Sequence, residues 1–394
     1  MPKIQSLQYS TRLGEQRLLE FNAGEVDPSF QMTLLTGQNG SQKSSVLRDL
    51  VSALILPDEG RKVEFSDFDE GQIKSPVICF SGSVADRFPV KMLGGRHTEF
   101  DVTNYHYIGQ RAGTNLLSKK LPLETAVTFA LNPSVNSRFS SPFFEKAFAF
   151  SGLHPSMSLD FRFEPKFRKQ IPSITPREIL RRALAETPDQ VSRGGISAAA
   201  ARNIVEEFSD DDFEALAGLI ANRKGRFLKL TLNADSETAT PEHRAVRLGL
   251  LLDILAIDRA TVQRESEEPF SVYELSSGEY HMLTSVLALG FSVTSDSIVS
   301  IDEPENSLHP QWQQEFMATV IELCAVMQNG HLVVSTHSPL IVASAKPGSM
   351  IVDLSVPRDV MPAQPAQFGA SSDSILLDQF GIASSRNLYV VDLV

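Results

Sequence analysis

The segment Gly37–Ser45 (GQNGSQKSS) is a glycine- and serine-rich turn between two strongly patterned stretches. An apolar run (MTLLTG) leads into it. Residues 43–56 follow with apolar side chains at helical spacing, and Pro57 stops that run. A strand joined to a helix by such a turn is the basic unit of an α/β protein, so the chain is constrained to a sheet that carries helices.

The turn has the residues needed to bind phosphate. Backbone N–H groups at a helix start attract anions, and a lysine in this position places a positive charge between the β- and γ-phosphates. We therefore expect Lys43 to contact the phosphates of ATP and Ser44 to bind Mg²⁺. The nucleotide-binding residues predicted here are Asn39, Gly40, Ser41, Gln42, Lys43, Ser44 and Ser45.

Gln42 departs from the usual phosphate-loop pattern, which has glycine at this position. A side chain is tolerable where the backbone approaches phosphate if its φ stays negative. We expect the exchange to slow ATP hydrolysis more than it weakens binding.

Three further segments carry polar residues at predicted strand ends. The apolar run SIVSIDE ends at Asp302, which would hold Mg²⁺, and Glu303, which would polarise the attacking water. His337 follows the strand 332–335 and could contact the γ-phosphate or the water, while Gln110 follows the strand 105–108 and could contact the metal. Alternatively, the acidic residues around Pro304 could simply begin a helix.

The segment YELSSGE precedes an apolar helix over residues 280–289 and predicts a second anion-binding helix start. Its candidate residues are Ser276, Gly278 and Glu279. Alone, such a segment is a common helix cap. Its position 23 residues before Asp302 favours a functional role.

Between the two sets of motifs the sequence predicts a mainly helical insertion. We divide the chain into residues 1–111 (first part of an ATPase head), 112–267 (insertion) and 268–394 (second part of the head with a short tail). Within the insertion we expect helices at Arg177–Glu186, Ser197–Phe208, Asp212–Asn222 and His243–Val262, and a strand at Phe227–Leu232. The phenylalanines of residues 139–167 favour a small core over a base-stacking platform, and the tail from Ser371 predicts a short helix and a strand-like ending.

Composition limits the class of partner. The chain has 36 basic and 48 acidic residues, a net charge of −12, so it is no polycation that coats nucleic acid. Its longest apolar stretch, residues 248–257, is about half a membrane span, and its N-terminus lacks a signal-peptide pattern. We expect a soluble cytoplasmic protein without membrane contact, with Cys79 and Cys324 as reduced core residues.

Together, the motifs GQNGSQKSS, LSSGE, SIVSIDEPENSLHP and VVSTHSP resemble the ABC-type ATPases of the SMC, RecF and RecN group, within the AAA family ATPases. The resemblance covers residues 1–110 and 268–355. It implies an α/β fold, namely an ABC-type P-loop ATPase head with a mixed sheet core, flanking helices and a helical insertion. It also implies ATP and Mg²⁺ as cofactors and head-to-tail dimers, in which Ser276, Gly278 and Glu279 act on the partner's ATP and residues 306–308 contact the partner.

The form IDEPENSLHP, with YHYIGQR and GASSDSILLDQFGI, looks most like the PtuA ATPase subunits of Septu and retron-associated phage-defence systems. That likeness implies a homo-oligomer that gates a separate effector. We find no HNH pattern in this chain, so an effector such as an HNH-type nuclease would be another protein.

Two alternatives remain. A RecF-like DNA-binding repair ATPase is favoured slightly by the basic residues of segment 161–182, although a solvated helical face explains them as well. The nucleotide-binding subunit of a membrane transporter is disfavoured, because the insertion between Gln110 and Leu275 is too long for a transporter coupling subdomain.

Overall fold

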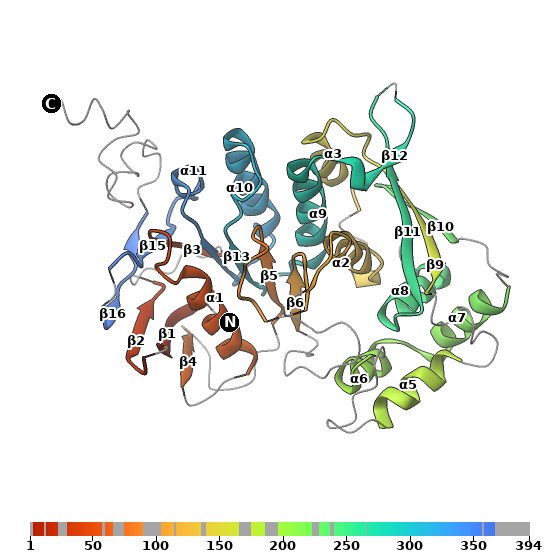
Figure 1. Cartoon of the computed structure of the whole chain (residues 1–394), viewed down its shortest axis with the longest axis horizontal. Helices are drawn as coiled ribbons and strands as arrows, with labels where there is room; N and C mark the ends of the chain where they lie inside the picture. Colours follow the sequence, from red (N-terminus) through yellow and green to blue (C-terminus); the bar gives the residue numbers. More distant parts are fainter. Residues whose placement is uncertain are drawn as a thin grey trace. The chain divides into compact units, whose positions relative to one another are not determined.

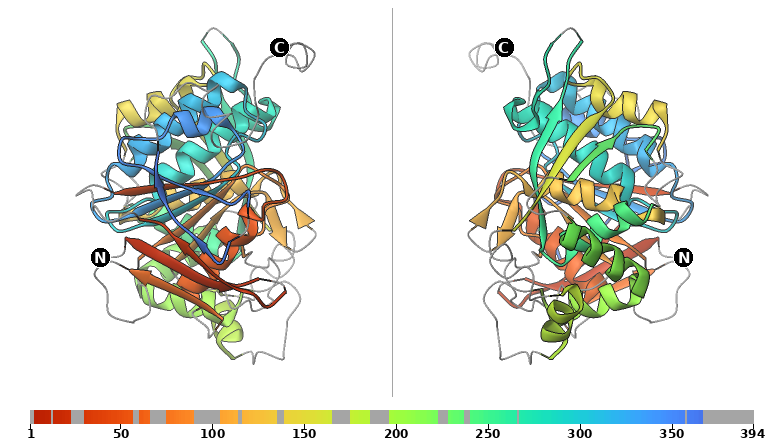
Figure 2. Two further views of the ribbon diagram at one scale, coloured as in Figure 1. Left: turned by 90° about the vertical axis from the view of Figure 1, so that its left-hand side faces the viewer. Right: turned by 90° about the vertical axis from the view of Figure 1, so that its right-hand side faces the viewer.

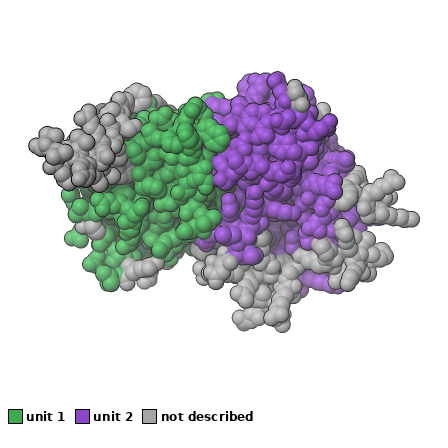
Figure 3. All heavy atoms as spheres, turned by 45° about the horizontal axis from the view of Figure 1, so that its top comes forward, with its two compact units in different colours: residues 1–89, 104–109, 293–394 green, residues 90–103, 110–292 purple. Residues whose placement is uncertain are grey.

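The structure, a computed structural model, describes the chain except for residues 1–2, 12, 23–29, 57–59, 66–74, 90–103, 114–115, 135–138, 165–174, 186–195, 223–227, 237–239, 266, 357 and 367–394. The chain forms two compact units, coloured separately in Figure 3. Unit 1 comprises residues 1–89, 104–109 and 293–394, and unit 2 comprises residues 90–103 and 110–292. The tail from Ser371, with its predicted helix and strand, lies outside the described residues.

The core of unit 1 is a sheet whose strands are parallel except for one edge strand, as predicted for the last third of the chain. Most of these strands are apolar and buried on both faces, as expected for a parallel sheet covered by helices. In spatial order they are β17 (Gln364–Pro365), β15 (Met350–Asp353), β3 (Gln31–Thr36), β14 (His331–Ser335), β13 (Ile298–Asp302), β5 (Val77–Ser81) and β6 (Tyr105–Ile108).

Three helices of unit 1 follow strands of this sheet: α1 (Lys43–Ile55), α10 (Pro310–Cys324) and α11 (Pro339–Ala343). A second sheet has the order β16 (Val360–Met361), β2 (Gln16–Glu20), β1 (Ile4–Ser10), β4 (Arg61–Phe65). Helix α1 contacts β4 of the second sheet as well as β5, β13 and β14 of the first (Figure 1). The carboxyl ends of β3, β14, β13 and β5 lie at one edge of the main sheet, since these strands run parallel.

Unit 2 contains both helices and strands. Its antiparallel sheet has the order β10 (Leu228–Leu232), β9 (Met157–Phe163), β11 (Leu255–Val262), β12 (Phe270–Ser271), and Figures 1 and 2 show β9, β10 and β11 side by side. Strands β7 (Arg111–Gly113) and β8 (Leu116–Leu117) pair as a two-stranded antiparallel ribbon. The helices are α2 (Leu121–Ala130), α3 (Ser141–Ala149), α5 (Pro176–Ala185), α6 (Ala198–Glu207), α7 (Asp210–Asn222), α8 (Pro241–Leu251), α9 (Ser277–Ser292) and the short 3₁₀ helix η2 (Val272–Glu274).

The phenylalanines of this unit form a core, as the sequence predicted. Phe144 and Phe148 are buried, and the Phe143 ring meets the Phe291 ring of α9 edge to face, with centroids 5.1 Å apart. Phe161 is buried in β9. A base-stacking platform needs exposed ring faces, which these buried rings lack. Phe167 lies outside the described residues.

The predicted helix His243–Val262 is wrong, because its second half is strand β11. Helix α8 ends where Asp253 takes a left-handed conformation with φ 58°. The Ile254 N–H then bonds to the Gly249 carbonyl at 2.9 Å and the Asp253 N–H to the Leu250 carbonyl at 3.0 Å, which is a Schellman helix end. The run LAIDRATV that follows alternates between buried and more exposed positions, as a strand does.

The compact units divide the chain differently from the predicted segments. Unit 2 extends to Ser292 and includes the segment LSSGE, whereas the predicted insertion ends at residue 267. The division 1–111, 112–267 and 268–394 therefore stays a prediction about domains.

No helix in the described part of the chain has both the length and the apolar character needed to cross a membrane.

Candidate functional site

The predicted phosphate loop joins β3 to α1 at the carboxyl edge of the main sheet. Gly40 has a φ of 89°, and Gln42 caps α1 in the left-handed conformation, with φ 68° and ψ 20°. Gln42 therefore lacks the negative φ that would make a side chain tolerable at this position. The loop requires a left-handed residue here, which glycine adopts freely and glutamine adopts only with strain.

A cavity of about 320 Å³ lies against this loop. It brings together most of the predicted loop residues and one of the predicted catalytic residues. Its lining consists of Asn39, Gly40, Gln42, Lys43, Ser44, Ser45, Ser83, Ala85, Arg87 and Glu303. Ser41 is absent from this lining, but it lines a second hollow of about 210 Å³ on the same loop, together with Tyr9, Arg17 and Met361.

Lys43 is buried and folds back onto its own loop. Its Nζ donates to the Gly37 carbonyl at 2.9 Å and to the Gln38 carbonyl at 3.3 Å. Burial lowers the pKa of Lys43, while the carboxylates of Glu303, Glu305 and Asp302 act in the opposite direction. The side chain is thus a positive charge held inside the loop.

Ser44 and Asp302 meet although they are 258 positions apart in the chain. The Ser44 hydroxyl donates to Oδ1 of Asp302 at 3.1 Å, and the Ser335 hydroxyl donates to the same oxygen. Burial raises the pKa of the Asp302 carboxyl to about 6, although these two hydrogen bonds lower it. At neutral pH the carboxylate is therefore mostly ionised while buried, which costs the folded state roughly 3 kcal/mol relative to an exposed aspartate.

A divalent cation fits this pair. A hydroxyl beside a buried, ionised carboxylate is a hard-oxygen donor set, and a cation would offset the buried charge. No group of three or more metal-ligating His, Cys, Asp or Glu side chains occurs among the residues that the structure describes. Mg²⁺ typically takes only one or two protein oxygens and completes its shell with phosphates and water, so Ser44 and Asp302 suffice on the protein side.

Glu303 follows Asp302 in a strained conformation, with φ 48°. Its N–H bonds to the Ser335 carbonyl at 3.0 Å, so β14 fixes the turn. Gly82 packs so closely that a Cβ there would lie 2.2 Å from the Glu303 carbonyl oxygen, and only glycine fits. Strain of this kind in a non-glycine residue is frequent at functional sites.

The Glu303 side chain lies between His337 and Asn306. Nδ1 of His337 is 3.7 Å from Oε1 of Glu303, and the Asn306 amide donates to Oε2 at 2.9 Å. His337 and Asn306 hold the pKa of the Glu303 carboxyl below its usual value, although burial opposes them, and Glu303 in turn raises the pKa of His337. Glu303 is therefore a carboxylate at neutral pH, as a general base must be.

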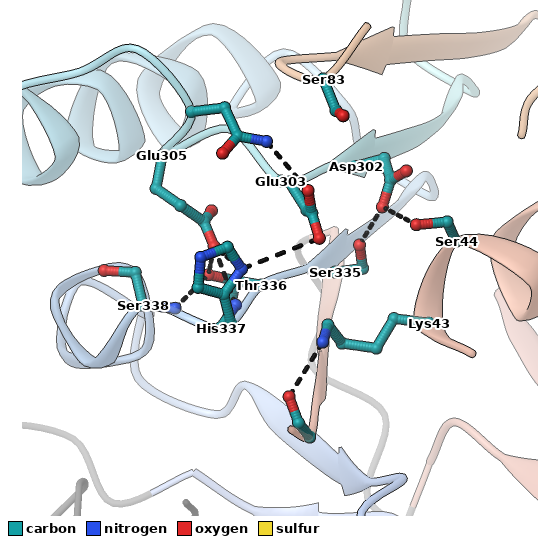
Figure 4. A network of polar contacts seen from close by, with 12 residues as sticks. Lys43, Ser44, Ser83, Asp302, Glu303, Glu305, Ser335, Thr336, His337 and Ser338 are labelled. Atoms are coloured by element: carbon teal, nitrogen blue, oxygen red, sulfur yellow. Dashed lines mark hydrogen bonds and ion pairs between the residues drawn. The ribbon is translucent and has the colours of Figure 1, made fainter. Parts of the chain in front are cut away.

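Glu305 was predicted only as part of an acidic helix start, but it has a distinct role in this network (Figure 4). Its Oε1 accepts from the Thr336 hydroxyl and from the His337 N–H, each at 2.8 Å, and lies 3.1 Å from Nδ1 of His337. The side chain of Glu305 is 4% exposed, against 24% for Glu303. Of these two carboxylates, only that of Glu303 lines the cavity, while Glu305 contacts the histidine.

Ser83 and Arg87 also line the cavity, and neither was predicted from the sequence. They follow β5, which pairs with β13, whereas Gln110 follows β6, one strand further from β13. The segment after β5, the strand adjacent to β13, therefore supplies this wall of the cavity. No local motif marks Ser83 or Arg87. Their position becomes visible only from the strand order.

The predicted signature residues belong to unit 2 and begin helix α9. The Glu279 carboxylate accepts from the Ser276 N–H at 2.9 Å and pairs with Arg264 at 2.8 Å. The Ser276 hydroxyl accepts from the Glu279 N–H at 3.3 Å. Gly278 is buried in the first turn of α9. The segment is thus a reciprocal helix cap with an exposed serine at its tip.

The chain was compared with known proteins by sequence and by structure. No curated protein matches the sequence significantly. Among solved structures, the chain is similar to the SMC head domain from Thermotoga maritima, with 11% identity, 93% and 99% of the two chains covered, and a TM-score of 0.37. A nucleotide-free ATP-binding cassette from an ABC transporter shares 13% identity over 100% and 98% of the two chains, with a TM-score of 0.38.

Residues 32–343 match the family described as "AAA domain, putative AbiEii toxin, Type IV TA system". The match includes the phosphate loop, Asp302, Glu303 and His337, and it covers most of the chain. The chain therefore belongs to this family of AAA ATPase domains.

Proposed function

We propose that the chain binds ATP with Mg²⁺ in the 320 Å³ cavity and hydrolyses it to ADP and phosphate. The observation that carries this proposal is the convergence of Lys43, Ser44, Asp302 and Glu303 on one loop from two distant parts of the sequence. The loop N–H groups and Lys43 would hold the phosphates. The second hollow, with Tyr9 and Arg17, would receive the nucleoside end.

The residues around Glu303 fit an attack by water on the γ-phosphate. Glu303, a carboxylate at neutral pH, would take a proton from the water as its oxygen bonds to phosphorus and the bond to the ADP oxygen breaks. His337 would orient that carboxylate and donate to phosphate oxygen, with Glu305 holding the imidazole in place. Mg²⁺, held by Ser44 and Asp302, would supply neutralising charge at the phosphates.

Two substitutions test this assignment. Lys43→Ala should abolish ATP binding because the loop loses its cation. Glu303→Gln should keep binding and lower turnover by roughly 10²- to 10⁴-fold, since the water loses its base. Glu206→Gln, an exposed glutamate on α6, is the matched control and should change neither quantity. Unchanged ATP affinity in Lys43→Ala would refute the phosphate-loop assignment, and normal turnover in Glu303→Gln would remove Glu303 as the base.

We further propose that ATP drives head-to-tail association of two chains, and that the assembly gates a separate effector in phage defence. The support is the motif set, together with the family description, which names a toxin system for its members. A pull-down of Glu303→Gln with ATP, followed by mass spectrometry, tests the role. A co-purifying nuclease or toxin would support it, and DNA without a protein partner would favour a RecF-like clamp.

The DNA-binding alternative gains no support from the basic segment. Each described arginine of the segment lies beside a carboxylate. These pairs are Arg162 with Asp258 and Glu164, Arg177 with Asp210, and both Arg181 and Arg182 with Glu178. Lys166, Arg168 and Lys169 lie outside the described residues. We therefore rank the DNA-handling function second.

A further inference from the structure

The segment that follows β5 supplies part of the cavity wall. Ser83, Ala85 and Arg87 line the same cavity as the phosphate loop and Glu303. Arg87 is exposed and lies between two buried residues, Asp86 and Phe88. Lys43 and Arg87 are the two basic side chains of this lining.

The backbone around Arg87 is fixed. The buried Asp86 carboxylate accepts from the Phe88 N–H at 3.1 Å and from the Tyr107 hydroxyl of β6 at 2.8 Å. At the start of the segment, the Gly82 N–H bonds to the Asp302 carbonyl at 3.0 Å. The Arg87 side chain is thus carried to the cavity by a turn that is anchored to its neighbouring strands.

The negative charges at the cavity favour a second basic side chain beside Lys43. A nucleoside triphosphate carries several negative charges, while the cavity also contains the Glu303 carboxylate and lies beside Asp302. Lys43 shares its Nζ between two carbonyls of its own loop. A guanidinium group binds two phosphate oxygens at once through its planar fork, which an ammonium group does not.

The segment also lies at the reacting end of the site. It begins at Gly82, which touches the Asp302 and Glu303 peptides, and Arg87 is absent from the second hollow that holds Tyr9 and Arg17. We propose that Arg87 contacts the terminal phosphate of bound ATP and stabilises the charge that develops there during transfer. This inference rests on the proposed ATPase function and adds a catalytic residue to it.

The test compares ATP with ADP. Arg87→Ala and Arg87→Lys are assayed beside Arg358→Ala, another exposed arginine of unit 1. With Mg²⁺ present, binding of each nucleotide is measured by calorimetry, turnover by phosphate release, and folding by thermal unfolding. Arg87→Ala should weaken ATP binding about tenfold or more and slow turnover, while ADP affinity changes less than about threefold.

Arg87→Lys should recover part of the lost ATP affinity, because it restores the charge without the fork. Arg358→Ala should match the wild type. Equal losses for ATP and ADP in a folded Arg87→Ala variant, or no loss for either, would overturn the inference. Wild-type protein that binds neither nucleotide would instead overturn the proposed function itself, so the two failures are distinguishable.

Discussion

The backbone of Gln42 is strained within the phosphate loop. Its left-handed backbone is strained by about 1–2 kcal/mol for a residue with a Cβ, and glycine would avoid this strain. Part of that gain is lost because glycine is more flexible when unfolded. We predict that Gln42→Gly raises the free energy of unfolding by about 0.5–1 kcal/mol in denaturant titrations. Because Gln42 lines the cavity, we also expect faster ATP turnover.

The control for this prediction is Gln42→Ala. Alanine removes the glutamine side chain from the cavity but keeps the Cβ, so it retains the backbone strain. We expect no gain in stability from it. If alanine stabilises the protein as much as glycine does, the side chain rather than the backbone conformation is responsible, and the strain argument fails.

The site residues that the sequence predicted are those placed by local structure. Lys43 and Ser44 begin a helix that follows a glycine-rich turn, and Asp302 ends an apolar run, so each position can be read from its neighbours. Arg87 and Glu305 could not be predicted in this way. Arg87 reaches the cavity because β5 pairs with β13, and Glu305 binds His337 across 32 positions of chain. Such contacts depend on strand order, which the sequence pattern leaves open.

Among the helices and strands, the sequence pattern predicted one helix where the structure has α8 followed by β11. The stretch LGLLLDILAIDRATV is apolar enough to satisfy a helical and a strand period at once. The deciding feature is the left-handed turn at Asp253, since it lets the chain reverse and pair with β9. Helices with one apolar face, such as α1 and α6, were predicted to within a residue of their bounds.

The start of α9 depends on Arg264, which links the strand β11 to the signature segment. Arg264 pairs with Glu279, and its guanidinium lies 5.0 Å from the centre of the Phe270 ring. We predict that Arg264→Ala loosens the first turn of α9, because Glu279 loses a partly buried partner. Hydrogen exchange should rise at this turn, stability should fall by about 1 kcal/mol, and ATP turnover should fall with unchanged ATP affinity.

Glu267→Ala provides the comparison for Arg264. Arg264 also lies 3.8 Å from Glu267, whose side chain is 56% exposed, and this contact leaves the Glu279 pair intact. The variant should therefore match the wild type in hydrogen exchange, stability and ATP turnover. Equal effects of the two substitutions would mean that loss of the Arg264–Glu279 pair is not what loosens α9.

The motifs are divided between the two units of the chain. Unit 1 contains the phosphate loop, Asp302, Glu303 and His337, and unit 2 contains Ser276, Gly278 and Glu279. Ser276 is exposed at the start of α9, and its hydroxyl accepts from the backbone N–H of Glu279. To contribute to hydrolysis, Ser276 must contact a bound phosphate. In the proposed head-to-tail dimer, this phosphate belongs to the ATP of the partner chain.

Mixing two inactive variants tests this arrangement. Lys43→Ala lacks a working phosphate loop, and Ser276→Arg blocks the signature at an exposed position. In a dimer of one chain of each kind, the phosphate loop of the Ser276→Arg chain faces the intact signature of the other chain, which forms one complete site. At equal amounts half of the dimers are mixed, so we predict that about a quarter of wild-type turnover returns. If each signature served its own chain, mixing would restore nothing, because neither chain would contain a complete site.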